Sequence, residues 1–162
     1  MNDPERKETA YHEAGHAVMG FILGRTPSTI DIIRDADGNA GHTDFAPDLL
    51  PKYKQWFNQS PEKQQYLKVR VLVSIAGTAA HDLLCPGRQH DSGDERDEAA
   101  AKDMIMETRS WADDHDNYLH SLKILARTKI IENWKKVEEV ANMLLRCNHI
   151  SGDELIRILR GD

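Results

Sequence analysis

The chain has 162 residues, the size of one domain that buries about 70% of its unfolded surface. Its 27 acidic and 21 basic residues give a formal net charge of −6. This excess of acid argues against nucleic acid as the main ligand, since phosphate binding needs a concentrated basic face. The sequence has no run of about 18 apolar residues, no apolar signal-peptide core and too few cysteines for a disulfide framework. We therefore predict one cytoplasmic domain, residues 1–162, without a nucleic-acid partner or a membrane segment.

A long first helix is predicted from Asp3 to Gly24. Asp3 is a favoured N-cap, Pro4 suits the first helical position, and Gly24 is typical of a helix end. Apolar and small residues recur at helical spacing along this segment, and we expect that face to lie against the core. They are Tyr11, Ala14, Gly15, Val18 and Ile22.

A small β-hairpin is predicted next. The residues near Ile30 alternate imperfectly between apolar and polar, and the pair at 37–38 (Asp-Gly) favours a turn. Gly41–Phe45 is suited to the returning strand. The polar, proline-containing stretch 47–61 is expected to be a surface loop with one helical turn at Tyr53–Phe57.

The rest of the chain is predicted to be helical. Apolar periodicity and end signals favour helices over residues 61–84, 94–108, 115–126, 128–147 and 155–159. The third and fourth of these segments are either two helices or one bent helix. The predicted fold class is therefore mainly α, an α+β domain with a small hairpin.

The first helix carries the motif His-Glu-x-x-His at residues 12–16. Because residues four apart lie one turn apart on the same face, His12 and His16 can bind one metal ion. Imidazole nitrogen suits zinc, and Glu13 beside the metal can accept a proton from water. A random shuffle of this composition would contain roughly 0.03 such matches. The motif therefore favours a catalytic zinc site over two incidental surface histidines.

A catalytic zinc site needs a third protein ligand, and residues 18–24 after the motif provide none. The predicted helix over 94–108 provides a candidate, since Asp97 lies four residues before the apolar Ala101 on its buried stripe. A carboxylate on a buried stripe is costly unless it is paired or bound to metal. The alternative is that Asp97 is a first-turn acid stabilised by the helix dipole, as capping explains Asp94.

Three further residues are candidates for the surroundings of the metal or for a substrate groove. Asp82 could accept a hydrogen bond from a ligand histidine, or form an ordinary helix-end pair with the adjacent His81. His42, in the expected edge strand, either lines a substrate groove or faces solvent.

Several segments resemble the peptidase domain of FtsH-type ATP-dependent zinc proteases. Residues 10–17 (AYHEAGHA) are similar to the opening of that domain. Residues 75–83 (IAGTAAHDL) are similar to the family's Gly-Gly-Arg-Ala-Ala-Glu-Glu-Leu helix. Residues 92–97 (SGDERD) match Thr-Gly-Ala-x-Asn-Asp, whose last Asp is the family's third zinc ligand. The resemblance therefore implies Asp97 as the third ligand.

The resemblance continues at residues 140–145 and 150–155, and so covers most of the chain. The sequence departs from the family in two respects. It contains no nucleotide-binding loop of the Gly-x-x-x-x-Gly-Lys-Ser/Thr kind, so a stand-alone relative or an excised domain is expected. In addition, His81 and Asp82 replace two family glutamates.

The motif and the resemblance together imply a zinc-dependent metalloendopeptidase with one Zn²⁺ per chain, held by His12, His16 and Asp97. Glu13 is the expected general base. The expected substrates are unfolded or flexible polypeptides that are cleaved without ATP. A separate unfoldase or adaptor is the expected source of any unfolding. The sequence is compatible with a homo-oligomer. The rival is a non-catalytic, zinc-stabilised domain that binds polypeptides or a partner. Glu13 favours the enzyme, because a purely structural site needs no general base.

Overall fold

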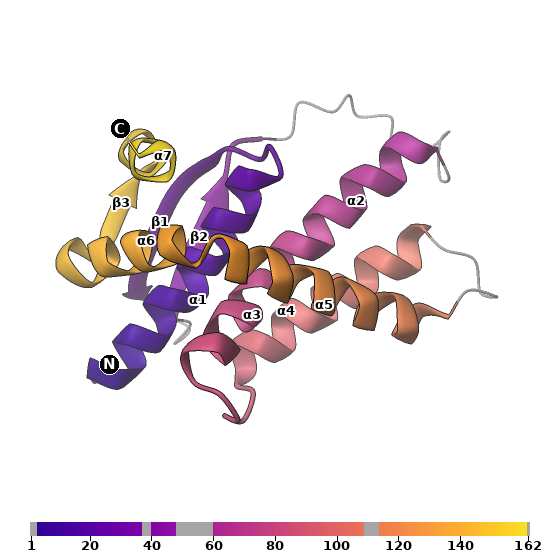
Figure 1. The fold of residues 1–162 in the computed structure, drawn as a ribbon, viewed down its shortest axis with the longest axis horizontal. Coiled ribbons are helices and arrows are strands. Elements are labelled where there is room, and N and C mark those ends of the chain that lie inside the picture. Colours follow the sequence, from indigo (N-terminus) through magenta and orange to yellow (C-terminus); the bar gives the residue numbers. More distant parts are fainter. Residues whose placement is uncertain (1–2, 37–39, 48–59, 109–113, 162) are drawn as a thin grey trace.

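The structure is a computed structural model that describes residues 3–36, 40–47, 60–108 and 114–161. Helices make up most of it (Figure 1). They are α1 (Asp3–Ile22), α2 (Pro61–Ser74), α3 (Ala76–Leu84), α4 (Ser92–Thr108), α5 (His115–Glu132), α6 (Trp134–Cys147) and α7 (Gly152–Arg160). The strands are β1 (Pro27–Arg34), β2 (Ala40–Phe45) and β3 (His149–Ser151). The predicted class, mainly α with a small β element, is confirmed. None of the described helices combines the length and the apolar character needed to cross a membrane.

The three strands form one antiparallel sheet in the order β2-β1-β3. Ile30 in the central strand lies opposite Thr43 of β2 and Ile150 of β3. Ile30 and Ile150 are fully buried, so the inner face of the sheet packs onto the core beside α1. The two strands of the predicted hairpin are confirmed, and the turn predicted at 37–38 lies outside the described residues. Strand β3 was not expected, because three residues are too short to show an alternating pattern.

Helix α1 is the central element of the fold, and it packs against the sheet, α3 and α6 (Figure 1). Its contact with α3 is close because small residues face each other. A Cβ added to Gly15 would lie 2.6 Å from the Ala76 carbonyl oxygen and 2.8 Å from the Ala80 Cβ. The backbones of α1 and α3 therefore lie in direct contact, and the larger side chains on either side of this crossing are brought together.

The prediction of one continuous helix over 61–84 is wrong. The helix breaks at Ile75, whose backbone angles are φ −88° and ψ 0°. The hydroxyl of Ser74 donates a hydrogen bond to the Asp97 carbonyl oxygen at 2.9 Å, which ties this break to α4. The apolar pattern gave no sign of the break, because Val73 and Ala76 on its two sides are both buried. Helix α2 packs on α4 and helix α3 packs on α1 as a result.

The other helix boundaries lie closer to their predicted positions. The predicted segments 115–126 and 128–147 are two helices, and they meet at Asn133 rather than near residue 127. The terminal helix begins at Gly152, a few residues before its predicted start. The helical turn predicted at Tyr53–Phe57 lies outside the described residues.

Candidate metal centre

His12 and His16 lie one turn apart on the face of α1 that meets α3 and α4. Their Nε2 atoms are 3.0 Å apart. Asp97 reaches the same point from α4, and its Oδ2 lies 3.1 Å from the His12 Nε2 and 3.2 Å from the His16 Nε2. The structure therefore brings together the three side chains that the sequence predicts as ligands, from two helices far apart in the chain.

The ring of His16 is oriented by the backbone of α2. Its Nδ1 lies 2.7 Å from the Val73 carbonyl oxygen, which can only accept a hydrogen bond. Nδ1 therefore carries a proton, and in the neutral ring that binds a metal the lone pair of Nε2 faces His12 and Asp97. This is the usual arrangement of a metal-binding histidine, whose second nitrogen donates to an oxygen.

Three observations show that the cluster fits a zinc ion. Two imidazole nitrogens and one carboxylate oxygen are a typical zinc donor set. Tetrahedral zinc with ordinary bond lengths places such atoms about 3.4 Å apart, within a few tenths of an ångström of the separations here. The buried Asp97 Oδ2 makes no well-aligned hydrogen bond, although it is close to both rings.

Gly77 of α3 leaves the room that this cluster needs. A Cβ built on it would lie 2.4 Å from the His16 Nε2 and 2.7 Å from the His12 Nε2. These distances are far below van der Waals contact, so any larger residue would push the two nitrogens aside. Glycine at position 77 therefore keeps the space in front of both ligand atoms open.

The electrostatics of the cluster favour charge separation between the carboxylate and the rings. Burial alone would lower the pKa of His16, but the Asp97 carboxylate outweighs burial and raises that pKa to about 9. Burial would raise the pKa of Asp97, whereas His16 and His12 hold it well below its ordinary value. Asp97 is therefore ionised near neutral pH, as a metal ligand must be.

Glu13 lies beside the cluster and is 5% exposed. Its Oε2 accepts a hydrogen bond of 2.6 Å from the Thr43 hydroxyl of β2. Gly41, with φ +84°, allows the strand to approach, because a Cβ there would lie 2.8 Å from the Glu13 Cγ. The strand thus fixes the position of the Glu13 carboxylate through a neutral hydroxyl group.

A second carboxylate, that of Asp94, lies near the other ring nitrogen of His12. Asp94 is 1% exposed, and its Oδ1 lies 3.7 Å from the His12 Nδ1. Its Oδ2 is 2.6 Å from Arg88 and accepts a hydrogen bond from the Asp91 backbone N–H at 2.9 Å. Burial would raise the pKa of Asp94, but the Asp91 N–H and Arg88 lower it on balance. Asp94 therefore has a buried partner side chain and does more than cap its helix.

The centre opens into a groove of about 630 Å³ between α1, β2 and α4. Strand β2 lines one wall of this groove and, in the described part of the chain, pairs through only one of its edges. His81 also lines the groove, but only 3% of its surface is exposed. Burial lowers the pKa of His81, and Arg88 lowers it further. His42 lies at the rim, where half of its side chain is exposed.

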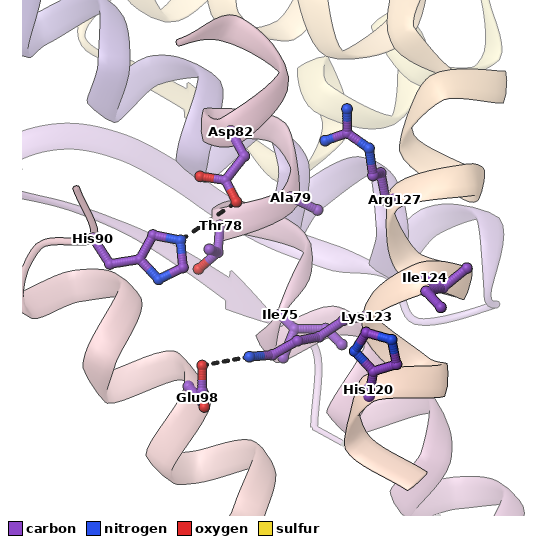
Figure 2. A pocket seen from close by; sticks show the side chains of 10 residues that line it. All are labelled: Ile75, Thr78, Ala79, Asp82, His90, Glu98, His120, Lys123, Ile124 and Arg127. Atoms are coloured by element: carbon purple, nitrogen blue, oxygen red, sulfur yellow. Dashed lines mark hydrogen bonds and ion pairs between the residues drawn. The ribbon is translucent and has the colours of Figure 1, made fainter. Parts of the chain in front are cut away.

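Asp82 does not lie in the groove. It faces a separate cavity of about 240 Å³ on the other side of α3, between α3, α4 and α5 (Figure 2). There it lies 3.4 Å from His90, and it also pairs with Arg88 at 3.2 Å. The carboxylate close to a ligand histidine is Asp94 instead. Sequence reasoning assigned Asp94 to capping, because nothing in the local pattern shows that Arg88 folds back onto it.

Comparison with known proteins points to one class of enzyme. Over its whole length the chain is 22% identical to an ATP-dependent zinc metalloprotease FtsH 2 of Salinibacter ruber, of which it spans 28%. It is 26% identical over 97% of its length to an FtsH 3 of Phytoplasma mali, again spanning 28% of that relative. With an FtsH of Sulfurovum it shares 31% identity over 65% of its length, which is 15% of the relative. No protein-family profile matches the chain.

The fold and the site define a helical protein with a histidine–carboxylate cluster beside a short sheet. The comparisons add a link to the zinc metalloproteases. More particularly, the chain is FtsH-peptidase-domain-like over most of its length, while it spans less than a third of each of these FtsH relatives.

Proposed function

We propose that the protein is a zinc-dependent metalloendopeptidase that cleaves unfolded or flexible polypeptides, with one Zn²⁺ per chain. The convergence of His12, His16 and Asp97 beside a buried Glu13 is the observation that carries this proposal. The zinc metalloprotease relatives support the same assignment.

The three ligand side chains would hold the metal in front of Gly77 and leave a position open toward the groove. Zinc, when bound, supplies polarisation of a peptide carbonyl and lowers the pKa of a coordinated water toward about 7. Glu13 accepts the proton of the attacking water on its carboxylate and donates it to the leaving amine. Thr43 holds that carboxylate in position through its hydroxyl.

The polypeptide is expected to bind in extended form along β2. One edge of this strand pairs with no other strand in the described residues, and it can pair with a substrate backbone, which gives affinity with little sequence preference. A stable folded domain exposes few such segments, so unfolded or flexible chains are the favoured substrates. Since the sequence contains no phosphate-binding loop, we propose that this cleavage needs no ATP.

The decisive experiment compares the wild-type protein with Glu13→Gln on a loosely structured protein substrate. We expect hydrolysis to fall by about two orders of magnitude or more, because the general base is lost. Zinc content should equal that of the wild type, because Glu13 is not a ligand. Glu139→Gln, which alters an exposed residue of α6 outside the groove, is the matched control and should retain full activity. Equal activity of wild type and Glu13→Gln would overturn the proposal and favour the non-catalytic binding domain.

The substrate class is tested with the same preparation. Cleavage of a loosely structured protein and of a tightly folded one is compared, each with and without ATP and with and without a chelator. We expect chelator-sensitive cleavage of the loose substrate only, unchanged by ATP. Stimulation by ATP, or rapid degradation of the folded substrate, would contradict the proposed substrate class.

A further inference from the structure

A second group of metal-ligating side chains lies next to the candidate zinc centre. Glu8 on α1, His81 on α3 and Cys85 at the end of α3 bring ligand atoms within 4.8 Å of one another. None of these residues is a predicted zinc ligand or takes part in the proposed reaction, although His81 was a candidate for the surroundings of the metal. The ring of His81 lies 6.2 Å from the ring of His12, so the two clusters are neighbours.

The spacing of these ligand atoms is close to that of a tetrahedral site. The His81 Nε2 lies 3.3 Å from the Glu8 Oε2, and the Cys85 Sγ lies 3.9 Å from the Glu8 Oε1. Zinc with ordinary bond lengths requires about 3.4 Å between nitrogen and oxygen and about 3.6 Å between sulfur and oxygen. These two separations involve different Glu8 oxygens, and all the ligand atoms lie within 4.8 Å of one another. Rotation of the partly exposed Glu8 and Cys85 side chains is therefore needed to bring the three donors to these distances.

The two helices hold this cluster rigidly. Glu8 precedes His12 by one turn of α1, and His81 precedes Cys85 by one turn at the end of α3. The close contact of Gly15 with Ala76 and Ala80 fixes the two helices against each other. The cluster is thus held by the same helix crossing that positions the first centre, which reduces the entropy lost when a cation binds.

The atoms that hydrogen-bond in the metal-free chain are the same atoms that a cation would use. With its proton on Nε2, His81 donates to the Glu8 Oε2, and the Cys85 thiol donates to the other Glu8 oxygen. A bound cation requires the tautomer with the proton on Nδ1, which directs the Nε2 lone pair into the cluster. The cluster remains accessible, since 41% of the Glu8 side chain is exposed and Cys85 is partly exposed.

We propose that Glu8, His81 and Cys85 form a second metal site, which takes a borderline-soft divalent cation such as Zn²⁺ or Co²⁺. The mixed sulfur, nitrogen and oxygen donors select such ions over Mg²⁺ and Ca²⁺. As the metal–sulfur bond forms, the Cys85 thiol releases its proton to the solvent. The fourth position is open to water on the exposed side. This site does not depend on the proposed peptidase activity.

Titration of the metal-free full chain with Co²⁺ tests the proposal, because only this site contains a thiolate. We expect two bound equivalents and a thiolate-to-cobalt charge-transfer band in the near ultraviolet. Cys85→Ser should lose the band and one equivalent while it retains the other. Cys147→Ser, which alters the distant cysteine of α6, is the matched control and should retain both.

Two further variants separate this site from the first centre. Glu8→Gln should weaken the binding that produces the band by about tenfold or more, with an unchanged circular dichroism spectrum. Asp97→Asn should lose the other equivalent and retain the band. A wild-type protein without the band, or a band that persists in Cys85→Ser, would overturn the second site. An Asp97→Asn variant that still binds two equivalents would instead count against the proposed peptidase centre.

Discussion

Helix α3 lies between two groups of ionisable side chains. In one group several buried atoms have no hydrogen-bond partner, whereas in the other group the charged side chains form ion pairs. Toward α1, the Asp97 Oδ2, the Asp94 Oδ1 and the His81 Nδ1 are all buried without a hydrogen-bond partner. On the other side of the helix, in the cavity of Figure 2, Glu98 pairs with Lys123 at 2.6 Å. Asp82 in that cavity pairs with His90. Among the described side chains that line it, none has a buried polar atom without a partner.

The difference indicates where a cation is needed. A buried polar atom without a partner costs free energy, so such atoms are rare unless a ligand satisfies them. Several of them on one side of α3, together with two histidines in contact, are typical of a metal-binding region. The opposite cavity holds comparable charges, but they neutralise one another. We therefore assign metal chemistry to the α1 side alone, and the following variants test that assignment.

The largest expected effect is a difference in zinc affinity between variants of two adjacent carboxylates of α4, Asp97 and Glu98. Asp97→Asn removes a proposed ligand, and zinc affinity should fall by about two orders of magnitude or more. Glu98→Gln is the matched control, since Glu98 faces Lys123 on the other side, and its zinc affinity should equal that of the wild type. Competition with a chromogenic chelator measures both. Full affinity in Asp97→Asn, together with loss in Asp94→Asn or His81→Ala, would assign the third ligand to one of those residues.

Gly77→Ala should weaken zinc binding by about tenfold or more while it leaves the fold intact. The added Cβ would lie 2.4 Å from the His16 Nε2, so the ring must turn away from the metal position. In the metal-free chain a ring that turns away loses contacts with Val73 and Asp97, which lowers stability, whereas the higher helix propensity of alanine raises it. These effects oppose each other, so stability should stay within about 1 kcal/mol of the wild-type value.

Ala79→Ser, which adds one atom on the cavity side of α3, is the control for Gly77→Ala and should bind zinc normally. Zinc titration and thermal unfolding in the presence of a chelator measure the two properties separately. Unchanged zinc affinity in Gly77→Ala would show that the centre does not lie against this face of α3.

Thr43→Val should reduce hydrolysis by about tenfold with zinc content unchanged. Valine keeps the shape of the side chain but removes the hydroxyl that donates to Glu13, and outer hydrogen-bond partners of a site contribute effects of about this size. Thr29→Val removes an exposed hydroxyl of β1 that faces Asp44 and serves as the control. Hydrolysis should fall in Thr43→Val alone, since only there does the general base lose a partner. Activity equal to that of Thr29→Val would assign Thr43 a purely structural role.

The parts of the site that sequence alone predicted are those with a local pattern. His12, Glu13 and His16 lie within one helical repeat, and Asp97 lies on the apolar stripe of its own helix. Gly77 and Thr43 could not be predicted in the same way, because their roles depend on contacts between elements far apart in the chain. Their signals in sequence, a glycine inside a helix and a threonine in a strand, are too common to single them out.

In the fold, too, the features that were predicted have a local sequence pattern, and those that were missed depend on contacts between distant segments. The period of α1 and the turn signal of the hairpin are local, so both elements were predicted. The break at Ile75 is set by packing on two different partners, α1 and α4, and the apolar pattern runs through it without interruption. Strand β3 exists because it pairs with β1 across more than a hundred residues, and no window of local sequence contains that pairing.

The smallest expected effect concerns the paired side of α3. Lys102 and Lys123 donate hydrogen bonds to Glu98 and lower its pKa to about 2. A carboxyl group whose pKa is lower in the folded chain stabilises the fold above its ordinary pKa of about 4.5, and this stabilisation is lost as the pH falls toward about 2. Because both lysines are partly exposed and solvent screens these pairs, Glu98→Gln should cost no more than about 1 kcal/mol at neutral pH. Urea unfolding of the metal-free wild type and variant, from about pH 7 to about pH 2.5, measures the difference in free energy of unfolding. That difference should shrink as the pH falls below about 4.5, and a difference independent of pH would show that these ion pairs do not stabilise the cavity side of α3.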